Sequence, residues 1–114
     1  MMEDFCVWID NSEGQFMPVY VAQCHKSLGN RIIRIGHYTS IEGDIIADPE
    51  MWFIYNEIEG IYFPSYYRQD CLDVEQESVK TVRGEIKMVD KFMQAEHTNF
   101  ANQWLENIRY QQNL

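Results

Sequence analysis

Hydrophobic and polar residues alternate in short blocks over the first two thirds of the chain, and this pattern predicts β-strands. The apolar run 5–9 ends in turn-forming residues and the run 16–23 follows, which predicts a first hairpin. Pro18 cannot donate a backbone hydrogen bond, so the second strand is expected at a sheet edge or with a bulge. The isoleucine-rich stretch 31–35, continued by 38–41, predicts a bent third strand.

Two further blocks predict the centre of the sheet. Asp48-Pro49 is expected to mark a stop, because the residue before a proline is pushed out of helical geometry. Five bulky residues at 51–55 then predict a central strand covered on both faces, with 61–67 as its antiparallel partner. The weak alternation over 72–79 predicts one more strand with one face in water.

From Glu85 onward the apolar residues recur every three or four positions, which is the period of an amphipathic helix. One unbroken helix over 85–111 would span about 40 Å. Two short helices fit equally well, because Thr98-Asn99 could cap a second one. The sequence leaves both possibilities open.

These elements predict an α+β fold in a single domain, residues 1–114. The expected architecture is an antiparallel sheet of five or six strands with a C-terminal amphipathic helix, or two short helices, packed on one face. Phe100, Trp104 and Ile108 are the expected anchors of the helix. Truncation of Trp104 to alanine is therefore expected to unfold the protein.

Composition and cysteine usage place the chain among folded proteins of a reducing compartment. Hydrophobic residues make up 46% and charged residues 24% of the 114 positions, which favours a globular domain over disorder. Cys6, Cys24 and Cys71 are an odd number without paired spacing, so they are expected to be buried, unpaired thiols. The acidic first residues and the lack of an apolar run of membrane length predict a soluble, cytoplasmic protein without a membrane partner.

Charge is distributed very unevenly along the chain. The net charge of -9 comes from the segment between Gly36 and Val79, where Arg68 is the sole base, since the remaining eight acids and eight bases balance. A field of one sign repels nucleic acid and membrane phosphates and attracts basic surfaces. The acids of this segment are the candidate partner-binding residues: Glu42, Asp44, Asp48, Glu50, Glu57, Glu59, Asp70, Asp73, Glu75 and Glu77.

Many of these acids lie two residues apart, which in an extended chain places carboxylates on one face about 6.6 Å apart. The leading hypothesis is a small, acidic, non-enzymatic interaction module that docks on a basic protein surface, such as that of a nucleic-acid-binding protein. The alternative is that charge keeps strand edges and turns soluble and discourages aggregation. Direct binding of nucleic acid is not expected, and the oligomeric state stays open.

Two other functions compete with this hypothesis. Asp44, Asp48, Glu50 or Asp70 could hold magnesium in an enzyme that acts on phosphate esters, because carboxylate oxygens suit hard cations. The spacing of these acids does not match a calcium loop, and no cofactor, catalytic residue or metal ligand is assigned. A subunit of a larger assembly, with its aromatic residues at an interface, is the third possibility. His97 lies on the apolar stripe of the expected helix and is interpreted as a core residue.

Several stretches together resemble a domain family of unknown function found in proteins of conjugative elements, plasmids and phages. They are 42–53, with its Gly-Asp turn and Asp-Pro-Glu-Met, then 64–70, 75–79 and the Phe-x-x-x-Trp helix 100–108. The resemblance covers about residues 37–114. It implies a bacterial or mobile-element protein of the cytoplasm, and it carries no activity, cofactor or catalytic residue. Within that setting, the leading hypothesis is an accessory or inhibitor protein of a mobile element.

Overall fold

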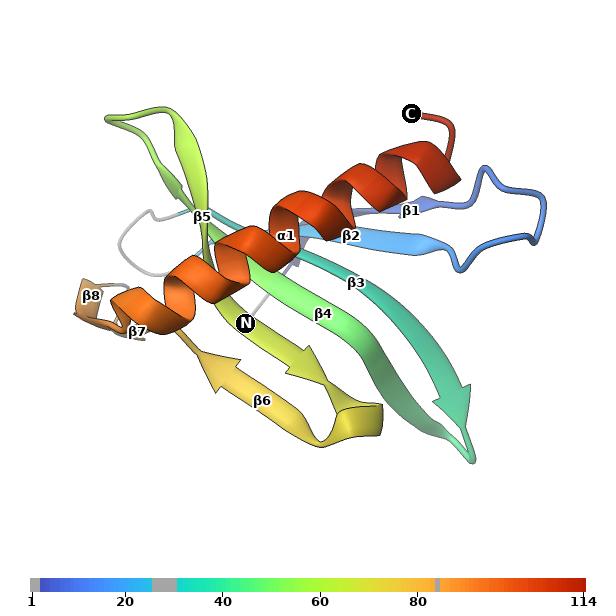
Figure 1. The fold of residues 1–114 in the computed structure, drawn as a ribbon, viewed down its shortest axis with the longest axis horizontal. Coiled ribbons are helices and arrows are strands. Elements are labelled where there is room, and N and C mark those ends of the chain that lie inside the picture. Colours follow the sequence, from blue (N-terminus) through green and yellow to red (C-terminus); the bar gives the residue numbers. More distant parts are fainter. Residues whose placement is uncertain (1–2, 26–30, 84) are drawn as a thin grey trace.

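The computed structural model describes residues 3–25, 31–83 and 85–114, and shows two antiparallel sheets beside one helix (Figure 1). The six strands of the larger sheet are β1 (Glu3–Ile9), β2 (Val19–His25), β3 (Arg31–Ile41), β4 (Asp44–Asn56), β5 (Ile61–Gln69) and β6 (Val74–Glu77). A short 3-10 helix, η1 (Asp70–Leu72), precedes β6, the strands β7 (Val79–Val82) and β8 (Glu85–Val89) form the smaller sheet, and α1 spans Lys91–Gln111. The predicted α+β class and six-stranded antiparallel sheet are confirmed.

Consecutive strands of the larger sheet pair in chain order from β1 to β6. The β3–β4 turn contains Glu42 and Gly43 with left-handed backbone angles, which suits a tight hairpin turn. β3 bends as predicted, because its register against β4 shifts between Gly36 and Tyr38. A Cβ atom at Gly36 would lie 2.6 Å from the Tyr38 ring, so any other residue there would displace this ring from its present position.

The structure corrects what the two prolines predict, namely a stop at Asp48-Pro49 and an edge strand or a bulge at Pro18. Asp48-Pro49 does not stop β4, which runs through both residues. The register of β4 against β3 shifts between Ala47 and Glu50, so Asp48 and Pro49 have no paired residue in β3. Proline therefore fits here, because no backbone N–H is needed for pairing. Pro18 lies just before β2, and β2 is an internal strand rather than an edge. The predicted strand 72–79 is divided into β6 and β7.

The helix begins later than predicted. Residues 85–89 form β8, paired with β7, because their apolar residues also alternate and the hairpin gives them a partner. Asp90 caps α1 by accepting a hydrogen bond from the Met93 backbone N at 3.0 Å. α1 is a single helix, and the Thr98 hydroxyl donates to the Gln94 carbonyl at 2.8 Å inside it instead of capping a second one.

Alternate residues of the strands make two separate hydrophobic clusters. Ala101, Trp104 and Ile108 of α1 share a buried cluster with Val19, Met51 and Phe53, and Figure 1 shows α1 lying across the strands. We call this face of the sheet the helix side. The other cluster holds Cys24, Ile32 and Ile54 with Val79 of β7, and its members alternate with those of the first along the strands. The opposite face, which we call the groove side, is therefore covered by β7 over part of its area.

Two expectations about single residues are corrected. Phe100, an expected anchor, is 37% exposed, and its neighbour Ala101 is buried instead. Cys24 is buried as predicted, but Cys6 on the outermost strand and Cys71 in η1 are exposed. No helix among the described residues combines the length and apolar character needed to cross a bilayer.

Candidate functional site

A groove of about 640 Å³ lies on the groove side, in the part that β7 leaves open. The strand register builds it. Tyr20, Glu50 and Arg68 stand in one row across the sheet, in line with Gly36, and Arg34 stands beside Trp52 in the next row. All of these side chains alternate with residues that face α1, so the same strands supply both surfaces.

The Glu50 carboxylate forms the floor of the groove and is only 5% exposed. It accepts a hydrogen bond from the Tyr38 hydroxyl and another, at 2.9 Å, from the Trp52 indole Nε1. Burial, and then the hydrogen bond to Glu50, raise the pKa of Tyr38 far above its usual range, so Tyr38 stays a donor at neutral pH. Glu50 was expected among the exposed acids, and the structure makes it a buried and doubly bonded one.

Aromatic rings line the groove on both sides of Glu50. Trp8 packs edge-on against Tyr20 with ring centres 5.9 Å apart, and Tyr20 packs the same way on Tyr38 at 6.0 Å. On the other side Trp52 and Tyr66 lie 4.7 Å apart. Trp8 is 55% exposed, so its ring is open to a ligand. Large amphipathic rings of this kind are common anchors in binding surfaces.

Both arginines of the groove have acidic partners besides Glu50. Arg34 forms an ion pair with Glu3, and its guanidinium lies 5.8 Å from the Tyr20 ring centre. Arg68 Nε lies 3.3 Å from Asp70 Oδ1. These pairs leave the Glu50 charge without an ion-pair partner of its own within 4 Å among the described residues.

β6 adds two more carboxylates to the groove side. Glu75 stands opposite Arg68 and Glu77 stands opposite Tyr66, and both acids are exposed. Burial, and then a hydrogen bond to Glu75, raise the pKa of Tyr66 to about 12. The groove lining itself holds one acid, Glu50, and two bases, Arg34 and Arg68, and the exposed acids Glu75 and Glu77 lie beside it on β6.

The other predicted acids are spread over two ends of the sheet. Glu42 and Asp44 lie at the β3–β4 turn, whereas Glu57 and Glu59 lie at the β4–β5 turn, at the other end of the 13-residue strand β4 (Figure 1). Asp73 follows η1. The structure therefore does not bring all ten acids onto one exposed surface.

Two of these acids support the fold where η1 meets β4. Asp70 accepts a hydrogen bond from the Ala47 backbone N at 2.7 Å, and Asp48 accepts one from Gln69 Nε2 at 2.9 Å. The Cys71 thiol also lies 3.4 Å from Asp48 Oδ1. Bonds of this kind hold a loop in place, so these carboxylates have a structural role whatever they bind.

The acids proposed as metal ligands do not come together. Over residues 3–25, 31–83 and 85–114, no three His, Cys, Asp or Glu side chains are grouped so that they could hold a metal ion. Glu50 points to its two donors, and Asp48 bonds Gln69 on the far side of the β-bulge. His97 is a buried core residue as predicted, with its Nε2 2.8 Å from Gln76 Oε1.

A family comparison matches the whole chain, residues 1–114, to the Domain of unknown function (DUF6908). The chain belongs to this family. The DUF6908 match confirms the expected domain of unknown function and extends it over the first 36 residues, which the motifs had not covered. No curated protein and no solved structure matches the chain.

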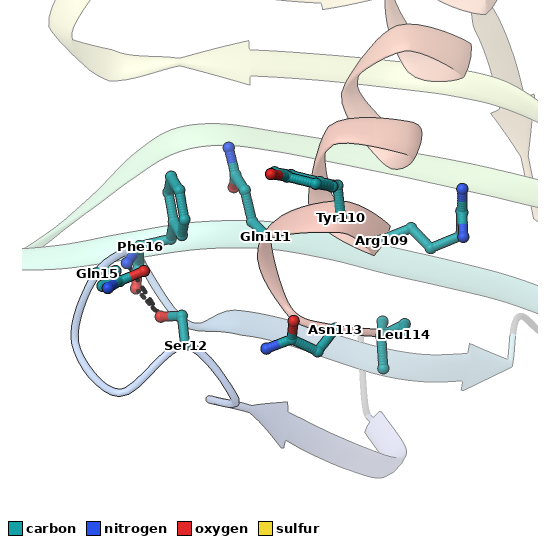
Figure 2. A pocket seen from close by; sticks show the side chains of 8 residues that line it. All are labelled: Ser12, Gln15, Phe16, Arg109, Tyr110, Gln111, Asn113 and Leu114. Atoms are coloured by element: carbon teal, nitrogen blue, oxygen red, sulfur yellow. Dashed lines mark hydrogen bonds between the residues drawn. The ribbon is translucent and has the colours of Figure 1, made fainter.

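A second hollow of this DUF6908 domain, about 440 Å³, lies where the end of α1 meets the β1–β2 loop (Figure 2). Beside it the fully buried Gln112 accepts a hydrogen bond from the Asn11 backbone N at 2.7 Å and donates to the Met17 carbonyl at 3.0 Å. In Figure 2 Ser12 bonds Phe16 within the same loop. The residues around this hollow fix the end of the helix to the loop, and they include no acid.

Sequence reasoning that started from the acidic segment missed the three groove residues that lie outside it. Trp8, Tyr20 and Arg34 lie in the first third of the DUF6908 domain, where four acids stand against three bases and no charge cluster drew attention. The strand period of two could have indicated that these residues share a face, because each stands next to an apolar residue of the opposite face, namely Val7, Val21 or Ile35. Register, which the sequence did not reveal, brings them next to Glu50.

Proposed function

We propose that this chain is a small, acidic, non-enzymatic interaction module whose groove side binds an arginine-rich segment of a basic partner protein. The observation that carries the proposal is the groove itself: a buried carboxylate between two sets of aromatic rings, with two more acids on the neighbouring strand. The exposed carboxylates of β6 and the open ring of Trp8, which lie on the same side of the sheet, suit guanidinium groups.

A guanidinium can stack on an aromatic face and bond a carboxylate at the same time. Trp8 offers an exposed ring, and Glu75 and Glu77 offer exposed carboxylates on the same side of the sheet. Phosphate groups of nucleic acid would meet the same acids and be repelled. A basic protein segment is therefore a better match to this surface than a nucleic acid.

The ten acids divide into groups within this proposal. The exposed Glu75 and Glu77 would contact the partner directly, and the buried Glu50 would attract it from the groove floor. Those near the β3–β4 turn and η1 would attract it at longer range: Glu42, Asp44, Asp48, Asp70 and Asp73. Glu57 and Glu59 lie at the other end of β4 and contribute to the net charge alone.

The biological setting is part of the same proposal. The motif resemblance supports an accessory or inhibitor protein of a mobile element, and the three free thiols suit the cytoplasm. A nucleic-acid-binding protein is a suitable partner, because its basic surface would be complementary to an acidic module.

The first test is a titration with a hexa-arginine peptide, followed by calorimetry and by tryptophan fluorescence. We expect binding that weakens as the salt concentration rises from about 50 mM to about 300 mM, because screening shortens the range of the charges. A hexa-glutamate peptide is the control and should not bind. Binding of hexa-arginine that is absent, or that is insensitive to salt, would refute the proposal.

The second test separates the groove from the overall charge. Glu75→Lys with Glu77→Lys, and Glu57→Lys with Glu59→Lys, both change the net charge from -9 to -5, since each substitution adds two charges. We expect the first pair to weaken hexa-arginine binding about tenfold or more and the second pair to have a small effect. Equal effects would mean that the peptide responds to net charge alone. Thermal melts would verify that both variants fold.

A further inference from the structure

The two edges of the six-stranded sheet differ sharply in length and chemistry. β6 has four residues, two of them the exposed acids Glu75 and Glu77. β1 has seven residues and exposes Phe5 by 54%, Val7 by 48% and Trp8 by 55%. Folded proteins protect sheet edges with charge or with short strands, and a long apolar edge is a template for pairing with another strand.

β1 is apolar on both of its faces. Phe5 and Val7 point to the helix side, in line with Val21, whereas Cys6 and Trp8 point to the groove side. Among the described residues β1 pairs with β2 alone, so no other described strand lies along its outer edge. A strand added there would cover apolar side chains on both faces and pair the backbone.

We infer that β1 pairs antiparallel with β1 of a second copy of this chain, which joins the two sheets into one around a two-fold axis. When β1 pairs antiparallel with β1 of a second copy, a two-fold axis relates the two copies, and the same residues form the interface in both. Such an interface gives a closed dimer. In a register centred on Cys6, Phe5 stands opposite Val7 of the second copy, and Asp4 stands opposite Trp8. No two acids then face each other.

The net charge does not prevent this pairing, because the surplus acids lie away from β1. β6 is five strand spacings from β1, about 24 Å. This exceeds the Debye length of about 8 Å at physiological salt, so repulsion between the two acidic edges is largely screened. At β1 itself, Glu3 is already paired with Arg34. β6 is unsuited to pairing with a copy of itself, because Glu75 and Glu77 would then lie within a Debye length of the same acids in the second copy.

The first experiment measures mass in solution for the full chain by light scattering, at concentrations from about 1 µM to about 1 mM so that weak association is included. We expect a dimer of twice the 13.6 kDa chain mass. Phe5→Lys with Val7→Lys should raise the dimer dissociation constant about tenfold or more, because like charges then stand opposite each other. Both positions are exposed and lie outside the groove, and thermal melts would show that the fold is kept.

Glu75→Lys with Glu77→Lys is the matched control at the other edge and should leave the dimer mass unchanged. A chain that stays monomeric over the whole concentration range would overturn the inference. A dimer that survives the lysines in β1, or that the substitutions in β6 abolish, would overturn it as well.

The second experiment tests the register with a short bifunctional maleimide that links two thiols. We expect a covalent dimer through Cys6, which Cys6→Ser abolishes and Cys71→Ser does not, although both thiols are exposed. Cross-linking that depends on Cys71 would overturn the inference. Because neither experiment uses a basic peptide, their outcome is independent of the proposed binding function.

Discussion

The two faces of the six-stranded sheet come from the same strands and differ in what they hold. On the helix side, Val19, Met51 and Phe53 lie with three residues of α1 in a buried apolar cluster. On the groove side, the open area holds a buried carboxylate, two arginines and several aromatic rings. One face accounts for the stability of the fold, and the other holds groups that can recognise a ligand.

Strand β4 shows the difference within a few residues. Met51 is fully buried on the helix side, while its neighbours Glu50 and Trp52 join through a hydrogen bond on the groove side. Because side chains alternate along a strand, a substitution on one face should leave the other nearly intact. The division of roles can therefore be tested by single substitutions.

The largest effect is expected from Trp104→Ala on the helix side. Trp104 is 8% exposed and belongs to the main cluster, so its truncation should cost about 3–5 kcal/mol of unfolding free energy. Urea denaturation measures this change. The matched control is Trp8→Ala on the groove side, which should stay within about 0.5 kcal/mol of the unmodified protein. Similar losses for the two variants would contradict the division between faces.

Gln112→Ala should have the next largest effect. The buried side chain bonds the Asn11 and Met17 backbones, and its loss leaves these groups without partners, at a cost of about 1–3 kcal/mol. Chemical denaturation of this variant is compared with that of Gln111→Ala, the preceding residue of the helix. If both variants had the same stability, the bond between the helix end and the β1–β2 loop would contribute nothing.

Glu50→Gln should have a smaller effect on stability and a clear effect on binding. The amide can still accept from Trp52, and the Tyr38 hydroxyl can turn to accept from it, so the loss should be about 1 kcal/mol. The missing charge should weaken hexa-arginine binding measured by calorimetry. Unchanged affinity in a stable variant would show that the groove floor does not take part.

The smallest effect is a dependence of stability on pH from His97. Burial lowers the pKa of this ring, so the folded state favours its neutral form. The unfolded state therefore binds the proton first, and stability should fall as pH drops below about 6.5, the ordinary histidine value. Melting temperatures from about pH 7 to about pH 5 would show a shallower fall for His97→Gln than for the unmodified protein. If the melting temperatures of both proteins fell equally, the pH dependence would come from groups other than His97.

The sequence predicted those parts of the structure that depend on local patterns. The hairpin of β4 and β5 followed from the bulky run at 51–55 and its partner, and the bend of β3 followed from Gly36. Residues 85–89 fit two periods, because Ile86 and Val89 have a helical spacing whereas Ile86 and Met88 have the spacing of a strand, and pairing with β7 decides between them. Local pattern alone could not make that choice.

The candidate site depends on long-range register, and the sequence revealed little of it. Counting charges identified Glu50, but its burial depends on Tyr38, twelve residues away and across a bulge. The same count placed Glu57 and Glu59 with the other acids, although β4 carries them to the opposite end of the sheet. The pairing of the strands brings the groove residues together, and the sequence alone does not reveal that pairing.

The three tryptophans report on the two faces directly, since Trp8 and Trp52 line the groove and Trp104 lies on the buried side of α1. The decisive measurement is an NMR titration of their indole N–H signals with hexa-arginine. The account predicts that the signals of Trp8 and Trp52 shift while that of Trp104 stays in place. Signals that all remain unchanged, or a shift confined to Trp104, would contradict it.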